Sequence, residues 1–256
     1  MYKSQRQSKI IELIDENDGV GVAALAELLK CSKMTIRRDL DEIEQRGLIN
    51  KVHGGAVKIK SNSLQPSFAN RVIENRDEKE AIARETVKLI GNGSVVFFDG
   101  GTTPLYVAKR IPLDISFTAV TNSLMTACEL CDKPHVNIIM LGGELHHSSY
   151  STVNSMPLSN VTRFHADLAL ISTRTVSYPE GLFESMLPLI DIKKALVSGS
   201  EKVVLLADHS KFTSKSLCMS VPFSDIDQII TDSKTDPEVI EKIRGLGVAV
   251  SVVEVL

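Results

Sequence analysis

Residues 32–46 read SKMTIRRDLDEIEQR, and this stretch decides how the N-terminal part of the chain folds. Ile36, Leu40 and Ile43 recur at helical spacing and form one apolar stripe, with Ser32 as the N-cap and Gly47 as the helix stop. Lys and Arg occupy the first half of this helix, whereas Asp and Glu occupy the second half. Because acidic side chains repel phosphates, only the N-terminal end of the helix suits a polyanion.

Two shorter helical patterns precede this stretch, over residues 4–17 and around Leu25, Leu28 and Leu29. A β-hairpin follows it, with strands over 48–53 and 56–60. Three helices and a hairpin predict a winged helix-turn-helix, whose third helix enters the major groove of DNA. The alternative is an ordinary amphipathic helix with a solvated face. The residues expected to contact DNA are Ser32, Lys33, Met34, Thr35, Arg37, Arg38, Lys51 and His53, with Lys58 and Lys60 also in the wing.

The charge distribution agrees with a basic N-terminal part. Residues 1–60 hold eleven Lys and Arg against nine Asp and Glu, whereas the remainder of the 256 residues holds eighteen against twenty-three. No apolar run approaches the roughly 18 residues of a membrane span, and no signal peptide is recognisable, so we expect a cytoplasmic protein. Four cysteines do not make a disulfide framework.

Beyond Gly91 the sequence alternates apolar β-type runs with helical windows. Continuous apolar runs predict strands buried on both faces, and hence a mostly parallel, doubly wound α/β domain. We therefore expect a winged helix-turn-helix domain over residues 1–60, a linker and the start of a connecting helix over 61–80, and the α/β domain over 81–256. The charges of residues 70–90 are interpreted as a solvated helix face. Strands are expected over 94–98, 115–121, 136–141, 167–173, 202–207, 226–231 and 248–253.

Residues 97–103 read FFDGGTT, so a glycine-rich turn follows a predicted strand and opens a helix. Such a turn presents backbone N–H groups and a helix dipole to an anion. It lacks the lysine of a P-loop, which argues against a nucleoside triphosphate, and the alternative is a tight turn without a ligand. Polar loops also follow other strands, and ligands of open parallel sheets bind outside the carboxyl ends of strands. The residues expected to bind a small anion are Asp99, Gly100, Gly101, Thr102, Thr103, Thr121, Asn122, Ser123, Gly142, Gly143, Arg174, Asp208 and Lys211.

The N-terminal part resembles the DeoR family of bacterial regulators. The resemblance is carried by Arg6, Ile10, Ile14, Ser32, residues 35–40, Gly47-Leu48 and residues 53–56. It implies that Asp39 is structural and does not read bases. The remainder resembles the effector domain of that family, which is similar to ribose-5-phosphate isomerase and CoA-transferase folds, through residues 99–103, 121–123, 141–143, 208–212 and 230–232.

The resemblance implies a transcriptional regulator, most simply a repressor of carbohydrate-metabolism genes, whose effector is a phosphorylated sugar or polyol. We expect operator DNA as a partner, a homodimer or homotetramer, no cofactor and no catalytic activity. Asp99 would suit a sugar hydroxyl. The chain departs from the family pattern at residues 153–157 and 172–175, where Arg174 either adds a second phosphate contact or pairs on the surface.

The sequence leaves two other functions open. A sugar-phosphate isomerase needs a carboxylate base near the sugar, for which Asp99 and Asp208 are candidates. A zinc site from Cys128, Cys131 and His146-His147 would require these residues to converge. Buried structural thiols are the simpler interpretation of the two cysteines, so we expect no metal.

Overall fold

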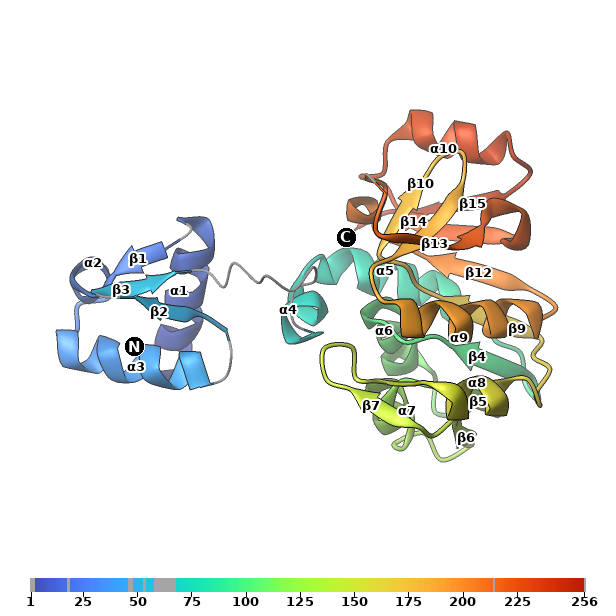
Figure 1. Cartoon of the computed structure of the whole chain (residues 1–256), viewed down its shortest axis with the longest axis horizontal. Coiled ribbons are helices and arrows are strands. Elements are labelled where there is room, and N and C mark those ends of the chain that lie inside the picture. The colour runs from blue at the N-terminus through green and yellow to red at the C-terminus, as the bar shows by residue number, and fades with distance from the viewer. Residues whose placement is uncertain are drawn as a thin grey trace. The chain divides into compact units, whose positions relative to one another are not determined.

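The computed structural model describes residues 3–17, 19–45, 48–52, 54–57, 68–213 and 215–255. The chain forms two compact units, Met1–Leu64 and Gln65–Leu256, which we call the head and the body (Figure 1). Each unit has its own hydrophobic core, so each is described by itself.

The described part of the head contains three helices and a three-stranded antiparallel sheet: α1 (Lys3–Glu16), α2 (Val22–Leu28), α3 (Lys33–Gln45), β1 (Gly19–Gly21), β2 (Asn50–Val52) and β3 (Gly55–Val57). The expected helices and hairpin are therefore confirmed. Strand β1 was not predicted, and it pairs with β3 on the side away from β2. Leu28 was wrongly placed on a buried face: it is 61% exposed, because α2 ends there and buries only Val22 and Leu25.

The body is built on seven strands, and all seven apolar runs of the sequence are confirmed. In chain order they are β4 (Val95–Phe98), β5 (Phe117–Thr121), β6 (Val136–Met140), β9 (Leu168–Ile171), β12 (Val203–Leu206), β14 (Gln228–Asp232) and β15 (Ala249–Val253). They form one sheet in the order β15-β14-β12-β9-β4-β5-β6, and every pairing in it is parallel.

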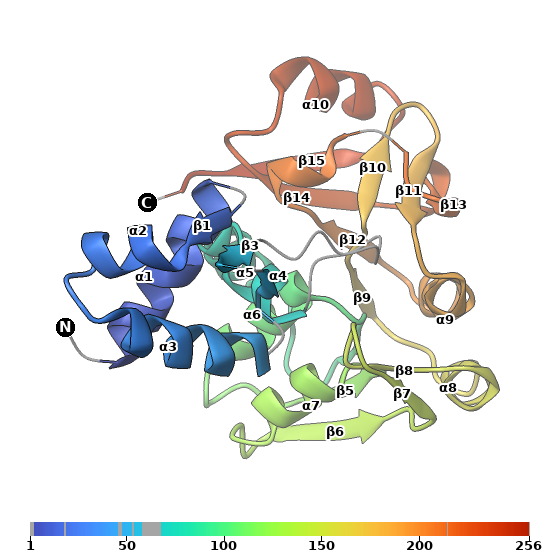
Figure 2. The same ribbon diagram turned by 60° about the vertical axis from the view of Figure 1, so that its left-hand side comes forward.

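Helices cover both faces of this sheet (Figure 2). One set is α5 (Arg76–Val87), α6 (Thr102–Arg110) and α7 (Leu124–Leu130), and the other is α8 (Ser155–Val161), α9 (Leu187–Ser198) and α10 (Pro237–Arg244). Adjacent residues of β4 show the two layers, because Phe98 packs with the first set and Phe97 with the second. The doubly wound arrangement is therefore confirmed. None of the helices in the described part of the chain is long and apolar enough to cross a membrane.

The strand order creates a switch point between β4 and β9. The chain runs outward from β4 through β5 and β6, and then returns to β9 on the other side of β4. In open parallel sheets the crevice outside the carboxyl ends of two such strands is the usual ligand site. The loops that begin at Asp99 and Ser172 lie at this point.

Short antiparallel strands escaped prediction because three to five residues leave no continuous apolar run. They form two small sheets beside the main one, in the orders β7-β8 and β10-β11-β13. Their bounds are β7 (Glu144–His146), β8 (Ser151–Val153), β10 (Thr175–Ser177), β11 (Gly181–Glu184) and β13 (Cys218–Pro222).

The charged segment at the start of the body is not simply a solvated face. Helix α4 (Phe68–Ile73) and all of α5 belong to the body, which begins at Gln65 rather than at residue 81. Glu78 and Lys79 are buried. Lys79 donates hydrogen bonds to the backbone carbonyls of Arg71 (2.6 Å) and Glu74, so it caps the carboxyl end of α4.

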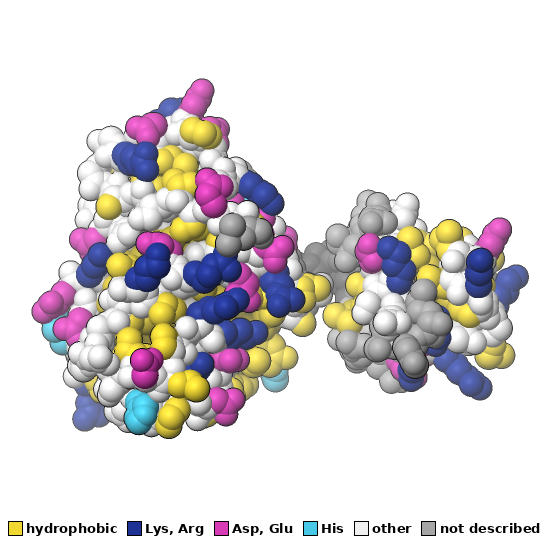
Figure 3. Space-filling model, turned by 180° about the vertical axis from the view of Figure 1, so that it is seen from behind, with side chains coloured by type: hydrophobic (Ala, Val, Ile, Leu, Met, Phe, Trp, Pro, Cys, Tyr) yellow, Lys and Arg dark blue, Asp and Glu magenta, His cyan; other side chains and the backbone are white. Residues whose placement is uncertain are grey.

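The body surface carries both signs of charge. On the face drawn in Figure 3, Lys and Arg side chains gather beside Asp and Glu side chains. Ion pairs account for part of this mixture, among them Arg110–Glu80 and Lys88–Glu85. Exposed pairs of this kind contribute at most about 1 kcal/mol each to the free energy of folding, so they add little to the stability of the body.

Candidate functional site

Helix α3 presents a cationic tip to solvent. Ser32 accepts a hydrogen bond from the backbone N–H of Thr35 (3.1 Å), which confirms it as the N-cap. The apolar stripe of the helix is fully buried in the core of the head. The opposite surface carries the exposed side chains of Lys33, Met34, Arg37 and Arg38.

A buried polar network fixes α3 against α1. Asp39 is 2% exposed and accepts hydrogen bonds from Arg6 Nε (2.6 Å) and Nη2 (3.2 Å). The hydrogen bond to Asp39 raises the pKa of Arg6, despite the opposing effect of burial. Gln7 donates to Glu42 (2.9 Å), one turn further along α3. Asp39 is therefore a structural residue, as the resemblance implied, and it holds α3 against α1.

The wing is described only in part. Lys51 forms an ion pair with Asp41 of α3, and its backbone N–H donates to Glu44 (2.8 Å). These contacts tie β2 to α3, so Lys51 would have to leave Asp41 to reach a phosphate. His53, Lys58 and Lys60 lie outside the described residues.

In the body, a pocket opens at the switch point between β4 and β9. It is narrow, with about 50 Å³ of free space, and its lining is strongly polar. Three loops (after β4, between β7 and β8, and after β9) and the beginning of α6 contribute to it, with side chains from α4, α9, the strands β11 and β12 and the short helix η1 (His209–Lys211). The lining residues are Arg71, Gly100, Gly101, Thr102, Thr103, Ser149, Ser172, Thr173, Arg174, Glu184, Leu189, Lys193, Leu206 and Lys211.

The glycine turn allows close packing of the loops around the pocket. A Cβ atom on Gly100 would overlap Ser151 Oγ, and one on Gly101 would overlap Ser172 Oγ. The glycines therefore let the neighbouring loops approach the turn. They also leave the N-terminus of α6 open towards the pocket, where backbone N–H groups favour an anion.

A buried ionic cluster forms the floor of the pocket. Lys193 is 2% exposed and pairs with Asp99 and with Glu184 (3.4 Å). Burial alone would lower the pKa of Lys193, but the two carboxylates outweigh it and raise that pKa. Burial raises the pKa of Glu184, against the opposing effect of Lys193. Asp99 Oδ2 also accepts a hydrogen bond from the backbone N–H of Ser172 (3.1 Å), so this oxygen belongs to the floor cluster.

Further cations surround the pocket. Arg71, Arg174 and Lys211 all line it. Lys211 Nζ lies 4.0 Å from Asp208, which is fully buried. Asp208 accepts hydrogen bonds from Asn75 Nδ2 (2.9 Å) and from the backbone N–H of Ser210 (3.1 Å), so it lies behind the pocket wall.

Seven of the thirteen expected residues are not in the lining: Asp99 and Asp208, described above, and Thr121, Asn122, Ser123, Gly142 and Gly143. Thr121 donates to the carbonyl of Phe98 (2.7 Å), and Ser123 caps α7 by accepting from Thr126 (3.2 Å). Asn122 is fully buried, and its side-chain oxygen has no partner among the described residues. Gly142 and Gly143 form a turn with φ of 75° and 108°, conformations that favour glycine. These residues support the loops of the sheet edge, and the structure does not bring them to the pocket.

Sequence reasoning missed Lys193, Glu184 and Arg71. A signal existed for Lys193, because it shares the buried face of α9 with Ile190 and Val197, at helical spacing. Glu184 ends a short strand that was not predicted, and Arg71 belongs to the charged segment interpreted as solvated. Their positions depend on which loops meet at the switch point, which periodicity does not reveal.

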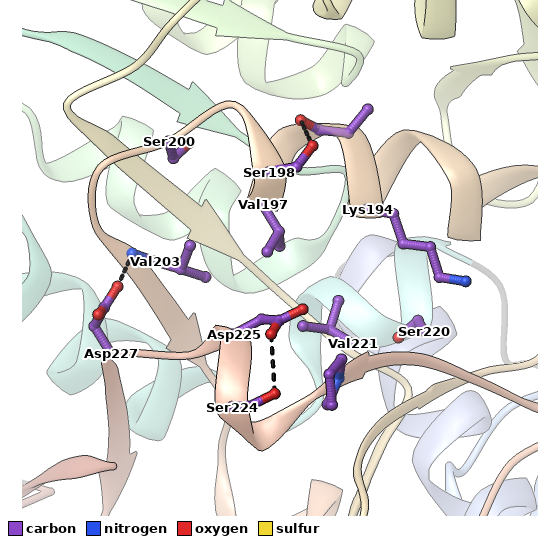
Figure 4. Close-up of a pocket in the computed structure, with 12 residues that line it drawn as sticks. Lys194, Val197, Ser198, Ser200, Val203, Ser220, Val221, Ser224, Asp225 and Asp227 are labelled. Carbon is purple, nitrogen blue, oxygen red and sulfur yellow. Dashed lines mark hydrogen bonds between the residues drawn. The ribbon is translucent and has the colours of Figure 1, made fainter. Parts of the chain in front are cut away.

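A wider hollow lies elsewhere on the body, between α9, β13 and the short helix η2 (Phe223–Asp225) (Figure 4). It offers about 540 Å³, so size alone would favour it as a ligand site. Its charged lining residues are Lys194, Asp225 and Asp227, and Asp227 accepts from the backbone N–H of Val203 (2.7 Å). One lysine beside two carboxylates does not favour an anion, so the chemistry points to the narrower pocket.

The cysteine and histidine residues that were candidates for a zinc site can be placed in the structure. Cys128 and Cys131 are exposed, so their interpretation as buried thiols was wrong. They lie at the end of α7, whose buried side chains are Thr126 and Leu130. Within the described ranges, no three His, Cys, Asp or Glu side chains are grouped so that they could hold a metal ion.

A winged helix-turn-helix with a cationic tip and an α/β body with a polar switch-point pocket define the class of ligand-sensing transcriptional regulators. Family models agree with both units. The model of the DeoR-like helix-turn-helix domain matches residues 6–62, and that of the DeoR C-terminal sensor domain matches residues 74–233. The chain therefore belongs to the DeoR family of transcriptional regulators.

The similarity to known regulators covers nearly the whole chain. The transcriptional regulator GolR of Listeria innocua is 35% identical over 254 residues, which cover 99% of this chain and 100% of that protein. The glycerol-3-phosphate regulon repressor of Escherichia coli is 33% identical and covers 91% of this chain and 92% of its own length. Among solved structures, ribose 5-phosphate isomerase A of Methanocaldococcus jannaschii matches with a TM-score of 0.41 and 16% identity, over 54% of this chain and 55% of that one.

Proposed function

We propose that the protein is a repressor of carbohydrate-metabolism genes whose affinity for operator DNA is set by a phosphorylated sugar or polyol in the switch-point pocket. The observation that carries this proposal is the joint lining of one pocket by the open N-terminus of α6, Arg71, Arg174 and Lys211. Backbone N–H groups and cations together recognise phosphate. The E. coli relative is a glycerol-3-phosphate regulon repressor, and its name supports the same class of ligand.

On the DNA side, Arg37 and Arg38 would read base edges or phosphates, and Ser32, Lys33, Met34 and Thr35 would meet the groove beside them. Lys51 and His53 would contact the backbone from the wing. Homodimers or homotetramers would place two heads on paired half-sites separated by whole turns of DNA.

Helices α4 and α5 are the part of the body nearest in sequence to the head, and both contribute to the surroundings of the pocket. They are the first helices of the body, and they follow residues 58–67. Arg71 of α4 lines the pocket, and Asn75 at the start of α5 donates to Asp208 behind it. An effector that draws Arg71 inward would therefore act on the segment nearest in sequence to the head. To lower the affinity for DNA tenfold, the effector needs to bind the conformation with weak DNA affinity only about 1.4 kcal/mol more favourably than the conformation with strong DNA affinity.

Catalysis is not part of the proposed function. Asp99, one of the two candidate bases, pairs with Lys193, and Asp208 lies behind the pocket wall. Glu184 does line the pocket, but it pairs with the same lysine. Isomerisation of a sugar phosphate at a physiological rate by the purified protein would favour the enzyme instead.

The DNA interface is tested by changing Arg37→Ala and Arg38→Ala together and measuring binding to the promoter region of the protein's own gene. We expect at least a tenfold loss of affinity and a salt dependence reduced by about one unit per lost phosphate contact. Arg163→Ala, an exposed arginine of the body, is the matched control. Unchanged affinity and sequence preference in the double variant would refute the recognition helix.

The effector pocket is tested by Thr102→Val and Lys211→Ala. Thermal-shift titration of the parent protein with a panel of sugar phosphates should identify ligands that stabilise it. Each variant should then lose at least tenfold in affinity for them. If no phosphorylated compound shifts the parent protein, the proposed effector class is wrong.

A further inference from the structure

Arg71 and Arg174 enter the same pocket from different elements, α4 and the loop after β9. Arg71 Nη2 donates to the carbonyl of Ser148 (3.0 Å), and its guanidinium carbon lies 5.4 Å from the ring centroid of Phe68. Its Nε is buried and has no hydrogen-bond partner among the described residues. The guanidinium group of Arg71 is thus held in place, and its Nε–H donor is unused among the described residues.

Neither guanidinium is matched by a carboxylate. No ion pair joins Arg71 or Arg174 to an acid within the part of the chain that the structure describes. Glu184, the carboxylate that lines the pocket with them, is 3.4 Å from Lys193 and belongs to the floor cluster. Burial lowers the pKa of Arg71 and the nearby positive charge of Arg174 lowers it further, against the opposing effects of Glu184 and Glu74.

Holding two like charges together in a partly buried site is unfavourable unless an anion joins them. Arginine also suits this task because its planar fork binds carboxylate and phosphate through two parallel hydrogen bonds. The pocket therefore has two anion-seeking regions: the N-terminus of α6 with Lys211, and the pair Arg71 and Arg174.

We infer that the effector carries two anionic groups, with its phosphate at Gly100–Thr103 and Lys211 and a second carboxylate or phosphate at Arg71 and Arg174. This inference rests on the proposed function and narrows it to phosphorylated sugar acids or sugar bisphosphates. Simple monophosphates of sugars and polyols would occupy only the first region. They would leave the two guanidiniums without a counter-charge and bind more weakly.

Two matched pairs of ligands test the second region by calorimetry on the full chain. D-Gluconate 6-phosphate and D-glucitol 6-phosphate differ only in a carboxylate against a hydroxymethyl group. D-Fructose 1,6-bisphosphate and D-fructose 6-phosphate differ in a second phosphate. In at least one pair we expect the member with the extra anion to bind about tenfold more tightly, and the pair concerned identifies the group as a carboxylate or a phosphate.

Arg174→Met should bring the affinity ratio of that pair to within about threefold, because it weakens binding of the member with the extra anion more than binding of the monophosphate. Arg174→Lys should restore part of the preference, because it keeps the charge but loses the fork. Arg163→Met is the matched control and should keep the full ratio.

Equal affinities within both pairs, or a preference that survives in Arg174→Met, would overturn the second anion region and leave the proposed function intact. If none of the four phosphorylated compounds binds the parent protein even at millimolar concentration, both the inference and the proposed effector class fall.

Discussion

The head and the body use positive charge in opposite ways. In the head, Arg37 and Arg38 are exposed, and neither has an ion pair within the described residues. In the body, Lys193 is buried between two carboxylates. Solvated cations attract a long polyanion through an electrostatic attraction that dissolved salt weakens. Buried cations instead need carboxylates to compensate their charge, and these ion pairs fix the positions of the side chains. The surface of α3 therefore suits a DNA duplex, whereas the buried charges of the body hold the loops of the pocket in a fixed geometry.

The comparison implies that Lys193 is the most costly charge to remove. Lys193→Met leaves Asp99 and Glu184 buried without their cation, so we expect a loss of about 3–5 kcal/mol in the free energy of unfolding of the body. Denaturant unfolding followed by circular dichroism measures this loss. Lys194→Met, at the next position but exposed, should change stability by less than about 0.5 kcal/mol. Equal effects of the two changes would show that the floor cluster is not a compensated unit.

The second prediction concerns Lys79, whose pKa burial lowers to about 8, despite the opposing effect of Asp208. In the unfolded chain a lysine keeps its proton up to about pH 10.4. Between pH 8 and that value the unfolded state binds more protons, so this lysine makes the body more stable as pH rises. The gain over this window is up to about 3 kcal/mol.

Unfolding of the parent protein and of Lys79→Met, measured from pH 7 to 10, tests this dependence. The parent should gain stability relative to the variant above pH 8, whatever the loss that the variant shows at pH 7. Groups that titrate in both proteins cancel in the difference. If the difference between their free energies of unfolding is constant from pH 7 to 10, burial does not lower the pKa of Lys79.

The same contrast explains what the sequence could predict. Solvated features follow local periodicity: the apolar stripe of α3 leaves Arg37 and Arg38 outward, and seven apolar runs predict the seven strands of the sheet. The glycine turn at Gly100 and Gly101 was also recognisable, because its residue types are needed wherever backbone packs closely.

Buried charges do not follow local periodicity in this way. Lys193 meets Asp99 across 94 positions of sequence, and Asn75 meets Asp208 across 133. Such contacts depend on which strands are neighbours in the sheet and on which helices pack beside them, and a single sequence does not show that order. For this reason the sequence alone assigned Asp99 to a ligand, whereas in the structure Asp99 forms an ion pair with Lys193.

The third prediction concerns a buried charge in the head, the carboxylate of Asp39. Arg6→Met leaves the buried carboxylate of Asp39 with Gln7, at 3.4 Å, as its remaining side-chain partner among the described residues. We expect a loss of about 2 kcal/mol in the stability of the head, together with weaker operator binding. Protection of α3 amides against hydrogen exchange should fall about thirtyfold. Lys3→Met removes an exposed pair between the same helices and should cost less than about 1 kcal/mol.

The smallest effect is expected at Ser32, where stability and DNA contact meet in one side chain. Ser32→Ala removes the hydrogen bond to the N–H of Thr35 and should cost about 1 kcal/mol in the stability of the head. Ser32→Asn restores a cap, and Ser32→Asp restores one that carries a negative charge. Operator binding separates the two roles: if Ser32 faces a phosphate, Ser32→Asp should bind DNA at least tenfold more weakly than Ser32→Asn, although both caps are equally stable. Equal DNA binding by the two variants would mean that the cap lies away from the duplex, and that the cationic tip begins at Lys33.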